Sequence, residues 1–153
     1  MTFLIGSRTK GMLLILFALG ACESTTAISV SPMMLEWASI DFHQELPDSG
    51  YDPLPITITN VSNNDIVITI RNLDEERLKL TGFLDLSSPP TLPPMSPSSS
   101  ASISLGVISY VPGELESTIE GAFTIDPGDG LESIDIPWSY TPIRNIPTDT
   151  GLP

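Results

Sequence analysis

Hydrophobic and polar residues alternate with a period of two along most of the chain from Ile28 onward, which is the pattern of β-strands with one buried face. The clearest alternation lies in two runs, 54–58 and 66–70, where apolar residues, chiefly isoleucine, occupy every second position. Between them, residues 62–65 read Ser-Asn-Asn-Asp, and asparagine side chains readily close tight turns. We therefore predict a β-hairpin with an isoleucine face in the core and a threonine face outside.

Further alternating runs predict the remaining strands, and no stretch after residue 28 has the spacing of an amphipathic helix. These runs cover residues 28–30, 35–37, 78–83, 101–110, 119–125 and 134–140. Pro32 and Pro137 favour sheet edges, because proline has no N–H to give to a ladder. Near Gly106 the inward positions change parity, which predicts a β-bulge. Seven to eight short strands without a helix predict an all-β fold, an antiparallel β-sandwich.

The segments between the predicted strands have the composition of loops. Residues 46–55 are rich in proline, glycine and aspartate and predict a loop, as do residues 126–130. Residues 72–77 indicate a charged loop in preference to a single helical turn. Residues 87–100 hold five prolines and six serines, so we expect an extended linker through which no ladder runs.

The N-terminal residues carry the composition of a secretory signal peptide. Two basic residues precede a short apolar run, 11–19, which ends at small residues. A membrane span needs about 20 apolar residues, so this run is too short to be one. The only cysteine of the chain, Cys22, closes the sequence Leu-Gly-Ala-Cys at 19–22.

This stretch resembles the lipobox of bacterial lipoproteins, in which a leucine, a small residue and a glycine or alanine precede the cysteine. The resemblance implies cleavage before Cys22, lipidation of its thiol and acylation, palmitate included, of its amino group. It also implies the outer membrane of a Gram-negative bacterium, because Glu23 stands where aspartate signals inner-membrane retention. An ordinary signal peptide that happens to contain a cysteine is the alternative.

These signals divide the chain into four parts. We expect a signal peptide at 1–21, a tether at 22–27, one β-sandwich domain at 28–141 and a disordered tail at 142–153. Removing the first 21 residues leaves 153 − 21 = 132 residues, which is long enough for one core. A single cysteine permits no internal disulfide, so the core alone must hold the fold.

The charge of the predicted mature part is strongly negative. It holds all 19 acidic residues and four of the six basic ones, a net charge of 4 − 19 = −15. Nucleic acid is excluded as a partner, since binding it begins with neutralising phosphates. The surface also repels anionic lipid, so the membrane is reached only through lipid on Cys22. The charge indicates solubility, or attraction to cations or a basic partner.

Candidate catalytic and metal-binding residues are few. His43 is the single histidine, with Ser39 and Asp41 nearby, but no nucleophile-elbow pattern accompanies them, so we expect no catalytic residue and no cofactor. The weak calcium candidate is a loop with three carboxylates, Asp126, Asp129 and Glu132, although we favour ordinary turn chemistry as the explanation of this loop.

Two further patterns have alternative interpretations. Residues 60–62 read Asn-Val-Ser, a glycosylation acceptor pattern, and we favour a turn there. Paired carboxylates for glycoside hydrolysis are a minor alternative, since nothing in the sequence places two of the acids on one surface.

Several short motifs resemble the immunoglobulin-like modules related to major sperm protein and to the ASPM, SPD-2 and Hydin group, including bacterial choice-of-anchor D domains. A Val-x-Pro-x-x-Leu-x-Phe-Gly opening is matched at 30–38, with Trp37-Ala38 in place of Phe-Gly. An apolar-x-apolar-x-Asn strand end is matched at 56–60, and Tyr110-Val111-Pro112 matches an aromatic-x-Pro element. Residues 95–100 match a Leu-x-Pro-Gly-x-Ser stretch, with Ser98 in place of Gly.

The resemblance implies an immunoglobulin-like fold and a scaffolding or adhesive role without catalysis. We therefore expect a lipid-anchored, non-catalytic cell-envelope module that binds a protein or glycan or holds an assembly together. The alternative is a small accessory subunit of an exported enzyme or transport machine. If the calcium candidate binds its ion, the function of this subunit would depend on calcium. An enzyme is a distant third, and the sequence does not identify the partner.

Overall fold

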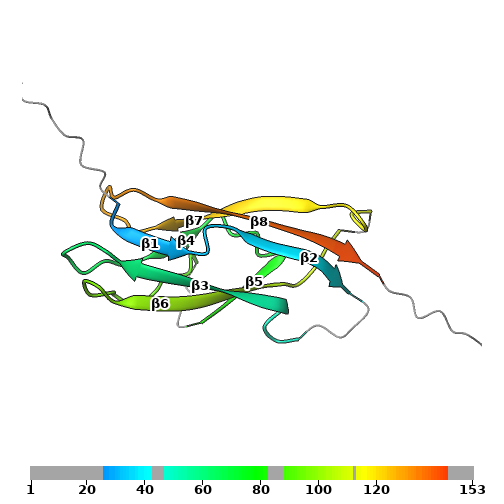
Figure 1. Ribbon diagram of the computed structural model, residues 1–153, viewed down its shortest axis with the longest axis horizontal. Helices are drawn as coiled ribbons and strands as arrows, with labels where there is room; N and C mark the ends of the chain where they lie inside the picture. The colour runs from blue at the N-terminus through cyan, green and yellow to red at the C-terminus, as the bar shows by residue number, and fades with distance from the viewer. Residues whose placement is uncertain (1–25, 43–46, 83–87, 112, 145–153) are drawn as a thin grey trace, which may run out of the picture.

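The computed structural model describes residues 26–42, 47–82, 88–111 and 113–144. In these ranges eight strands form two four-stranded sheets that pack face to face, and no helix occurs (Figure 1). The first sheet has the order β1 (Ile28–Ser31), β3 (Tyr51–Asn60), β6 (Ser100–Val107) and β5 (Leu78–Gly82). The second has the order β2 (Leu35–Asp41), β8 (Ile134–Ile143), β7 (Ile119–Asp126) and β4 (Thr69–Arg71). The predicted all-β, immunoglobulin-like β-sandwich is confirmed.

The core lies between the two sheets and consists of the alternating apolar positions. Ile56 and Ile58 are fully buried on the first sheet, and Phe123 and Ile136 on the second. Burying a large apolar side chain contributes about 1.5–3 kcal/mol, so these inward faces hold the sheets together.

The two isoleucine runs do not form the predicted hairpin. β3 pairs with β1 and β6 in the first sheet, whereas β4 pairs with β7 in the second. Their isoleucines are buried as expected, and Ile58 and Ile68 are both fully enclosed. The prediction was wrong because alternation reveals which side of a strand is buried, not which strand lies beside it.

One strand pair is parallel, although we expected antiparallel pairing throughout. β2 runs parallel to β8, with Leu35 opposite Trp138. β8 lies between β2 and β7, so the expectation that Pro137 marks an edge strand was wrong. Pro137 is tolerated because the pairing with β2 begins only at Trp138, and no bond to β2 is lost. The expectation for Pro32 is confirmed, since β1 and β2 lie at the edges of their sheets.

The bulge predicted near Gly106 lies in the strand opposite. β6 keeps a regular register with β5, while in β3 two residues, Asp52 and Pro53, stand opposite the single residue Gly106. The loop predicted at 46–55 was therefore wrong in its second part, which is strand. Gly106 is needed here because a Cβ at this position would lie 2.1 Å from the backbone oxygen of Ser49.

The domain extends beyond both predicted boundaries. Ala27, which we assigned to the tether, is only 2% exposed and belongs to the core. Next to it, the Thr26 hydroxyl donates to the Glu132 carboxylate at 3.0 Å. At the other end β8 continues to Ile143, past the predicted boundary at 141.

The proline-rich linker at 87–100 pairs locally with the region of β4, contrary to our expectation. Thr91 forms an isolated bridge with Thr69, and Met95 forms one with Ile66. Leu92, which lies between the two bridge residues, is buried, and so is Met95. A few non-proline residues are enough to attach the linker to the sandwich.

Candidate functional site

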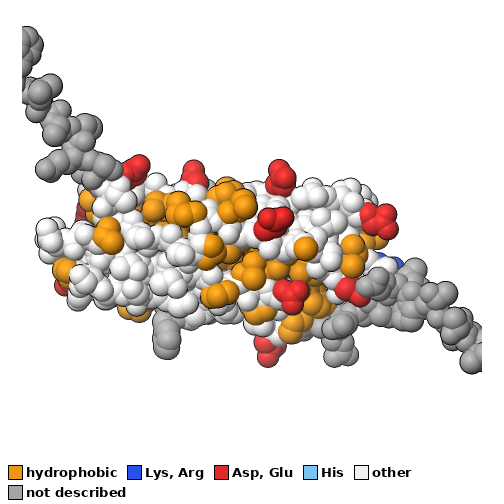
Figure 2. Space-filling view, viewed as in Figure 1, with side chains coloured by type: hydrophobic (Ala, Val, Ile, Leu, Met, Phe, Trp, Pro, Cys, Tyr) orange, Lys and Arg blue, Asp and Glu red, His pale blue; other side chains and the backbone are white. Residues whose placement is uncertain are grey.

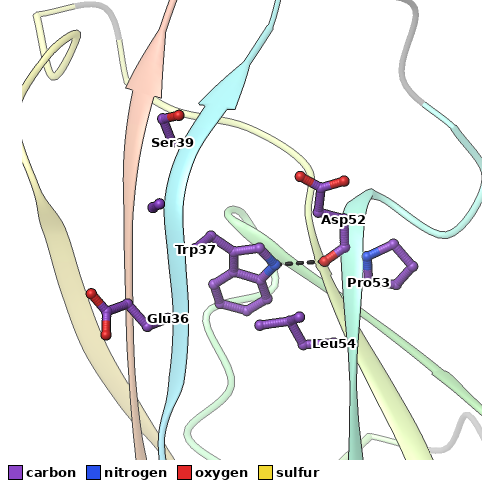
Figure 3. A pocket seen from close by; sticks show the side chains of 7 residues that line it. Glu36, Trp37, Ser39, Asp52, Pro53 and Leu54 are labelled. Atoms are coloured by element: carbon purple, nitrogen blue, oxygen red, sulfur yellow. Dashed lines mark hydrogen bonds between the residues drawn. The ribbon is translucent and has the colours of Figure 1, made fainter.

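A groove opens at one long edge of the sandwich, between β2 of the second sheet and the beginning of β3 in the first (Figure 3). Its volume is about 540 Å³, and it is lined by Glu36, Trp37, Ala38, Ser39, Asp52, Pro53 and Leu54. Figure 2 looks onto β1, β2 and β3 and shows hydrophobic side chains gathered along the middle, with acidic side chains around them. We call this feature the edge groove and treat it as the candidate functional site.

Trp37 forms the floor of the edge groove. Because side chains alternate along a strand, Trp37 points inward while Glu36 points to the other side of β2 (Figure 3). The Trp37 indole is 4% exposed, and its N–H donates to the backbone oxygen of Asp52 at 2.6 Å. This hydrogen bond joins the edge of one sheet to the bulge of the other.

Irregular pairing on both sides shapes the groove. β2 shifts its register against β8 between Trp37 and Ile40, so that Ala38 and Ser39 are both exposed. Opposite them β3 bulges at Asp52, whose φ of 44° lies in the left-handed region that aspartate tolerates. The two irregular segments face each other across the indole.

The polar groups of the edge groove are two carboxylates and a hydroxyl, from Glu36, Asp52 and Ser39. Neither carboxylate has a hydrogen-bond or ion-pair partner among the described residues. Among the described residues of the lining, none supplies an imidazole, a thiol or a cation that could activate a nucleophile. The chemistry of the edge groove suits binding, and its free carboxylates suit a positively charged partner.

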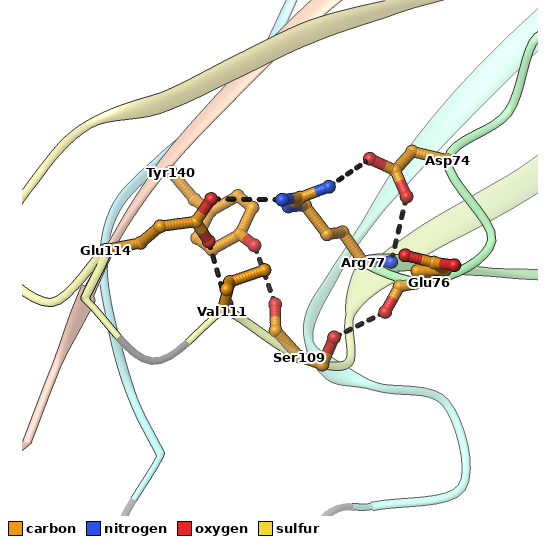
Figure 4. Close-up of polar contacts among 7 residues, drawn as sticks. All are labelled: Asp74, Glu76, Arg77, Ser109, Val111, Glu114 and Tyr140. Carbon is orange, nitrogen blue, oxygen red and sulfur yellow. Dashed lines mark hydrogen bonds and ion pairs between the residues drawn. The ribbon is translucent and has the colours of Figure 1, made fainter.

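A second polar cluster surrounds Arg77 (Figure 4). Its guanidinium donates to the Asp74 carboxylate at 2.9 Å and to the Glu114 carboxylate at 3.0 Å. These hydrogen bonds, first that to Asp74, raise the pKa of Arg77. The backbone N–H of Val111, together with Arg77, lowers the pKa of Glu114. The cluster joins the loop before β5 to the loop before β7.

Tyr140 of β8 attaches this cluster to the core. Its hydroxyl donates to the backbone oxygen of Ser109 at 2.6 Å, and burial raises the pKa of Tyr140 to about 12. The Ser109 hydroxyl in turn donates to the backbone oxygen of Glu76 (Figure 4). These groups bond to one another, and none of them lines the edge groove. We therefore regard the cluster as structural.

Two of the three residues of the calcium candidate, Asp126 and Glu132, have partners within the protein. The carboxylate of Asp126 accepts from the Arg71 guanidinium at 2.5 Å, and the N–H of Gly128, with Arg71, lowers the pKa of Asp126. Glu132 accepts the hydroxyl of Thr26. Within the described ranges, no group of three acidic, histidine or cysteine side chains is placed to hold a metal ion, Asp129 included.

Asn60 closes a turn, as we favoured over glycosylation. Its amide nitrogen donates to the backbone oxygens of Asn64 and Met95, both at 2.8 Å. Its amide oxygen accepts from the N–H and the hydroxyl of Ser62. Because Asn60 is fully buried and its amide is saturated, the folded protein cannot present it to a glycosylating enzyme.

Two sequence-predicted residues, Cys22 and His43, lie outside the described residues. The lipidation of Cys22 and the expectation that His43 has no catalytic role therefore stay predictions. No helix in the part of the chain that the structure describes is long and apolar enough to cross a membrane.

The sequence did not reveal the edge groove. The sequence placed Trp37 only in an alternating run and in a family motif, where it replaces Phe, and it placed Asp52 in a loop. The one signal available was the tryptophan itself, because a buried indole N–H usually has a hydrogen-bond acceptor. Which backbone oxygen supplies it depends on the separation of the two sheets, which strand periodicity does not encode.

No protein-family model matches the chain, and no curated protein matches it by sequence. Similar solved structures include WR4, a C. elegans member of the MSP family, with a TM-score of 0.47 and 8% identity over 76% of this chain and 99% of that chain. The E. coli chaperone DraB has a TM-score of 0.48 and 14% identity, over 76% of this chain and 56% of that chain. The periplasmic chaperone SfaE has a TM-score of 0.45 and 15% identity, over 78% of this chain and 60% of that chain. This chain spans less than two thirds of each chaperone.

Proposed function

We propose that the chain is a lipid-anchored, non-catalytic module of a bacterial cell envelope that binds a protein or glycan partner through the edge groove. The observation that carries the binding role is the combination of an apolar floor at Trp37 with free carboxylates at Glu36 and Asp52. The anchor rests on the lipobox-like sequence at 19–22. The resemblance at Glu23 favours the outer membrane of a Gram-negative bacterium.

The position of the edge groove suits a module held at its N-terminal end. Only residues 23–25 separate Cys22 from the first described residue, a reach of at most about 14 Å in extended chain. β1 and β2 then follow one another along the long axis of the sandwich (Figure 1). The groove lies roughly 25–30 Å along this path from Ile28, at the rise of an extended chain. A lipid at Cys22 would leave the groove accessible above the membrane surface.

The charge supports this arrangement. A mature part with a net charge of −15 is repelled by anionic lipid, so the sandwich stands off from the bilayer instead of lying on it. Two or more acyl chains hold a protein durably at a membrane, which a single chain does not do. The proposed lipid is therefore the attachment, and the protein surface stays free for a partner.

The anchor is tested by expressing the full chain in a Gram-negative host fed with labelled palmitate. We expect the wild type to be labelled and to fractionate with the outer membrane. Cys22→Ser should lose the label and the lipoprotein-specific cleavage. Wild-type protein without lipid in the soluble fraction would contradict the lipoprotein, and recovery in the inner membrane would contradict only the sorting.

The binding role is tested by site-specific photo-crosslinking in the same cells. A photoreactive amino acid at Ser39, in the edge groove, should give a discrete adduct with a protein or glycan. The matched control carries the same amino acid at Asp65, an exposed turn residue outside the groove. Equal adducts from both positions, or none from Ser39, would contradict a role for the edge groove.

A further inference from the structure

β1 and β2 follow one another along the chain but belong to different sheets, and this change of sheet leaves strand edges uncovered at the groove. β1 covers β3 only from Thr57 to Asn60, so the earlier part of β3 has no strand on that side among the residues that the structure describes. The chain then crosses to the second sheet, where β2 pairs with β8 on one side only. Within the described residues, the far side of β2 therefore borders the edge groove and no strand.

An uncovered strand edge presents backbone groups that an extended chain can bind. Along a strand, the N–H and C=O groups of successive residues point alternately to the two sides. Residues 36–39 of β2 therefore direct part of their backbone groups away from β8 and towards the groove. Proteins that bind peptides by strand addition use such an edge for affinity and the side-chain surroundings for specificity.

The side chains around this edge differ on its two sides. On the inner side, Trp37 and Leu54 form an apolar surface between the sheets. On the outer side, Glu36 stands free, opposite to the direction of Trp37 (Figure 3). Asp52 stands free on the facing strand. An added strand would place alternate residues on Trp37 and beside Glu36, since cross-strand neighbours lie about 4.5–5.5 Å apart.

The charge also selects among possible occupants. Free edges of natural proteins are often protected by charged residues against pairing with other chains. Here a second copy would bring its own Glu36 to an equally acidic edge, and the predicted mature part of each copy carries a net charge of −15. A basic strand gains attraction at the same place. The edge is thus selective against self-association and receptive to a cationic chain.

We propose that the edge groove binds an extended basic polypeptide segment, in which apolar and cationic residues alternate, by adding it as a strand to the free edge of β2. This inference rests on the proposed function and names the chemistry of the partner. Apolar side chains of the segment pack on Trp37 and Leu54. Lysine or arginine side chains pair with Glu36, and a cation at the end of the segment reaches Asp52.

The test uses detergent-solubilised full-length protein and a fluorescent ten-residue peptide of alternating valine and lysine, followed by fluorescence anisotropy. We expect saturable binding to the wild type, weakened by added salt because the charges are exposed. A peptide of alternating valine and glutamate should not bind. A valine-lysine peptide methylated at alternate backbone nitrogens keeps the charge but loses its donors, and it should bind at least tenfold more weakly.

The variants locate the site. Glu36→Lys should weaken binding of the valine-lysine peptide at least tenfold, whereas Asp65→Lys, with the same change of charge at an exposed turn, should change it less than twofold. Addition of the peptide should also slow hydrogen exchange of the amides at 36–39. Equal weakening by the two variants, or undiminished binding of the methylated peptide, would overturn strand addition.

The two proposals can fail separately. If no alternating peptide binds while the Ser39 crosslinker still gives its position-specific adduct, the inference about the partner is wrong and the binding role stands. If a glycan is found in that adduct, the same conclusion follows.

Discussion

The indole N–H of Trp37 donates to the backbone oxygen of Asp52 at 2.6 Å, and this bond connects the edge strand of one sheet to the bulge of the other. Trp138, on the neighbouring strand, is equally buried, yet its indole N–H has no partner among the described residues. The two buried tryptophans therefore differ in hydrogen bonding, since the indole N–H of Trp37 has an acceptor and that of Trp138 has none among the described residues. The comparison isolates what the bond at the edge groove contributes.

We predict that Trp37→Phe destabilises the protein more than Trp138→Phe. Both changes remove the same volume from the core, but only the first deprives the Asp52 carbonyl of its donor. The difference should be about 1 kcal/mol, the usual net contribution of a hydrogen bond. Urea unfolding of both variants measures it, and a larger loss for Trp138→Phe would contradict the assigned role of the bond.

Gly121 of β7 is required by the indole of Trp138. A Cβ at position 121 would lie 2.3 Å from Cζ2 of that ring, closer than non-bonded carbon atoms approach. We expect Gly121→Ala to cost about 1–3 kcal/mol, as overpacking of a core does. In a Trp138→Phe background the smaller ring should relieve the clash, so that Gly121→Ala costs less. Thermal unfolding of the four proteins checks this, and additive losses would exclude a direct contact.

The inward face of the second isoleucine run provides a test of the packing. Ile68 is fully buried, while Val67, one residue earlier, is 47% exposed. Ile68→Asp would bury an unpaired charge and should cost several kcal/mol, enough to threaten the whole domain. Val67→Asp should change the melting temperature little. Similar melting temperatures for the two variants would show that the assigned face is reversed.

Tyr140 should make the stability depend on pH in the alkaline range. Burial raises its pKa from the ordinary value of 10.0 to about 12, because the phenolate is disfavoured in the core. The native state therefore keeps the proton longer than the unfolded chain does. The resulting stability is complete below pH 10 and is lost as the pH rises towards 12. Urea unfolding between pH 8 and 12 should show a shallower decline for Tyr140→Phe than for the wild type, and identical slopes would contradict this.

Millimolar calcium should leave the melting temperature of the full-length protein unchanged. Asp126 is held by Arg71 and the N–H of Gly128, and Glu132 accepts from Thr26, so a calcium ion would have to compete with these partners. A ligand that binds only the native state must raise the melting temperature by mass action. A rise with calcium that disappears in Asp129→Ala would restore the calcium site that the loop composition suggested.

Residue periodicity alone determined which side chains face the core. The alternation placed Ile56, Ile58, Ile68 and Ile70 inward, and each is fully buried. Local composition also placed the turn at 62–65 correctly, where Asn60 saturates its amide. Such features depend on a residue and its near neighbours, because the two sides of a strand alternate whatever lies beside it.

The partners of each strand were decided only by the tertiary structure. The isoleucine runs belong to different sheets, β2 runs parallel to β8, and Pro137 lies in a central strand. The edge groove likewise depends on two bulges that meet across the sandwich, joined by Trp37 and Asp52. Pairing, register shifts and the distance between sheets arise from the packing of segments remote in sequence, and a period of two is the same for every possible neighbour.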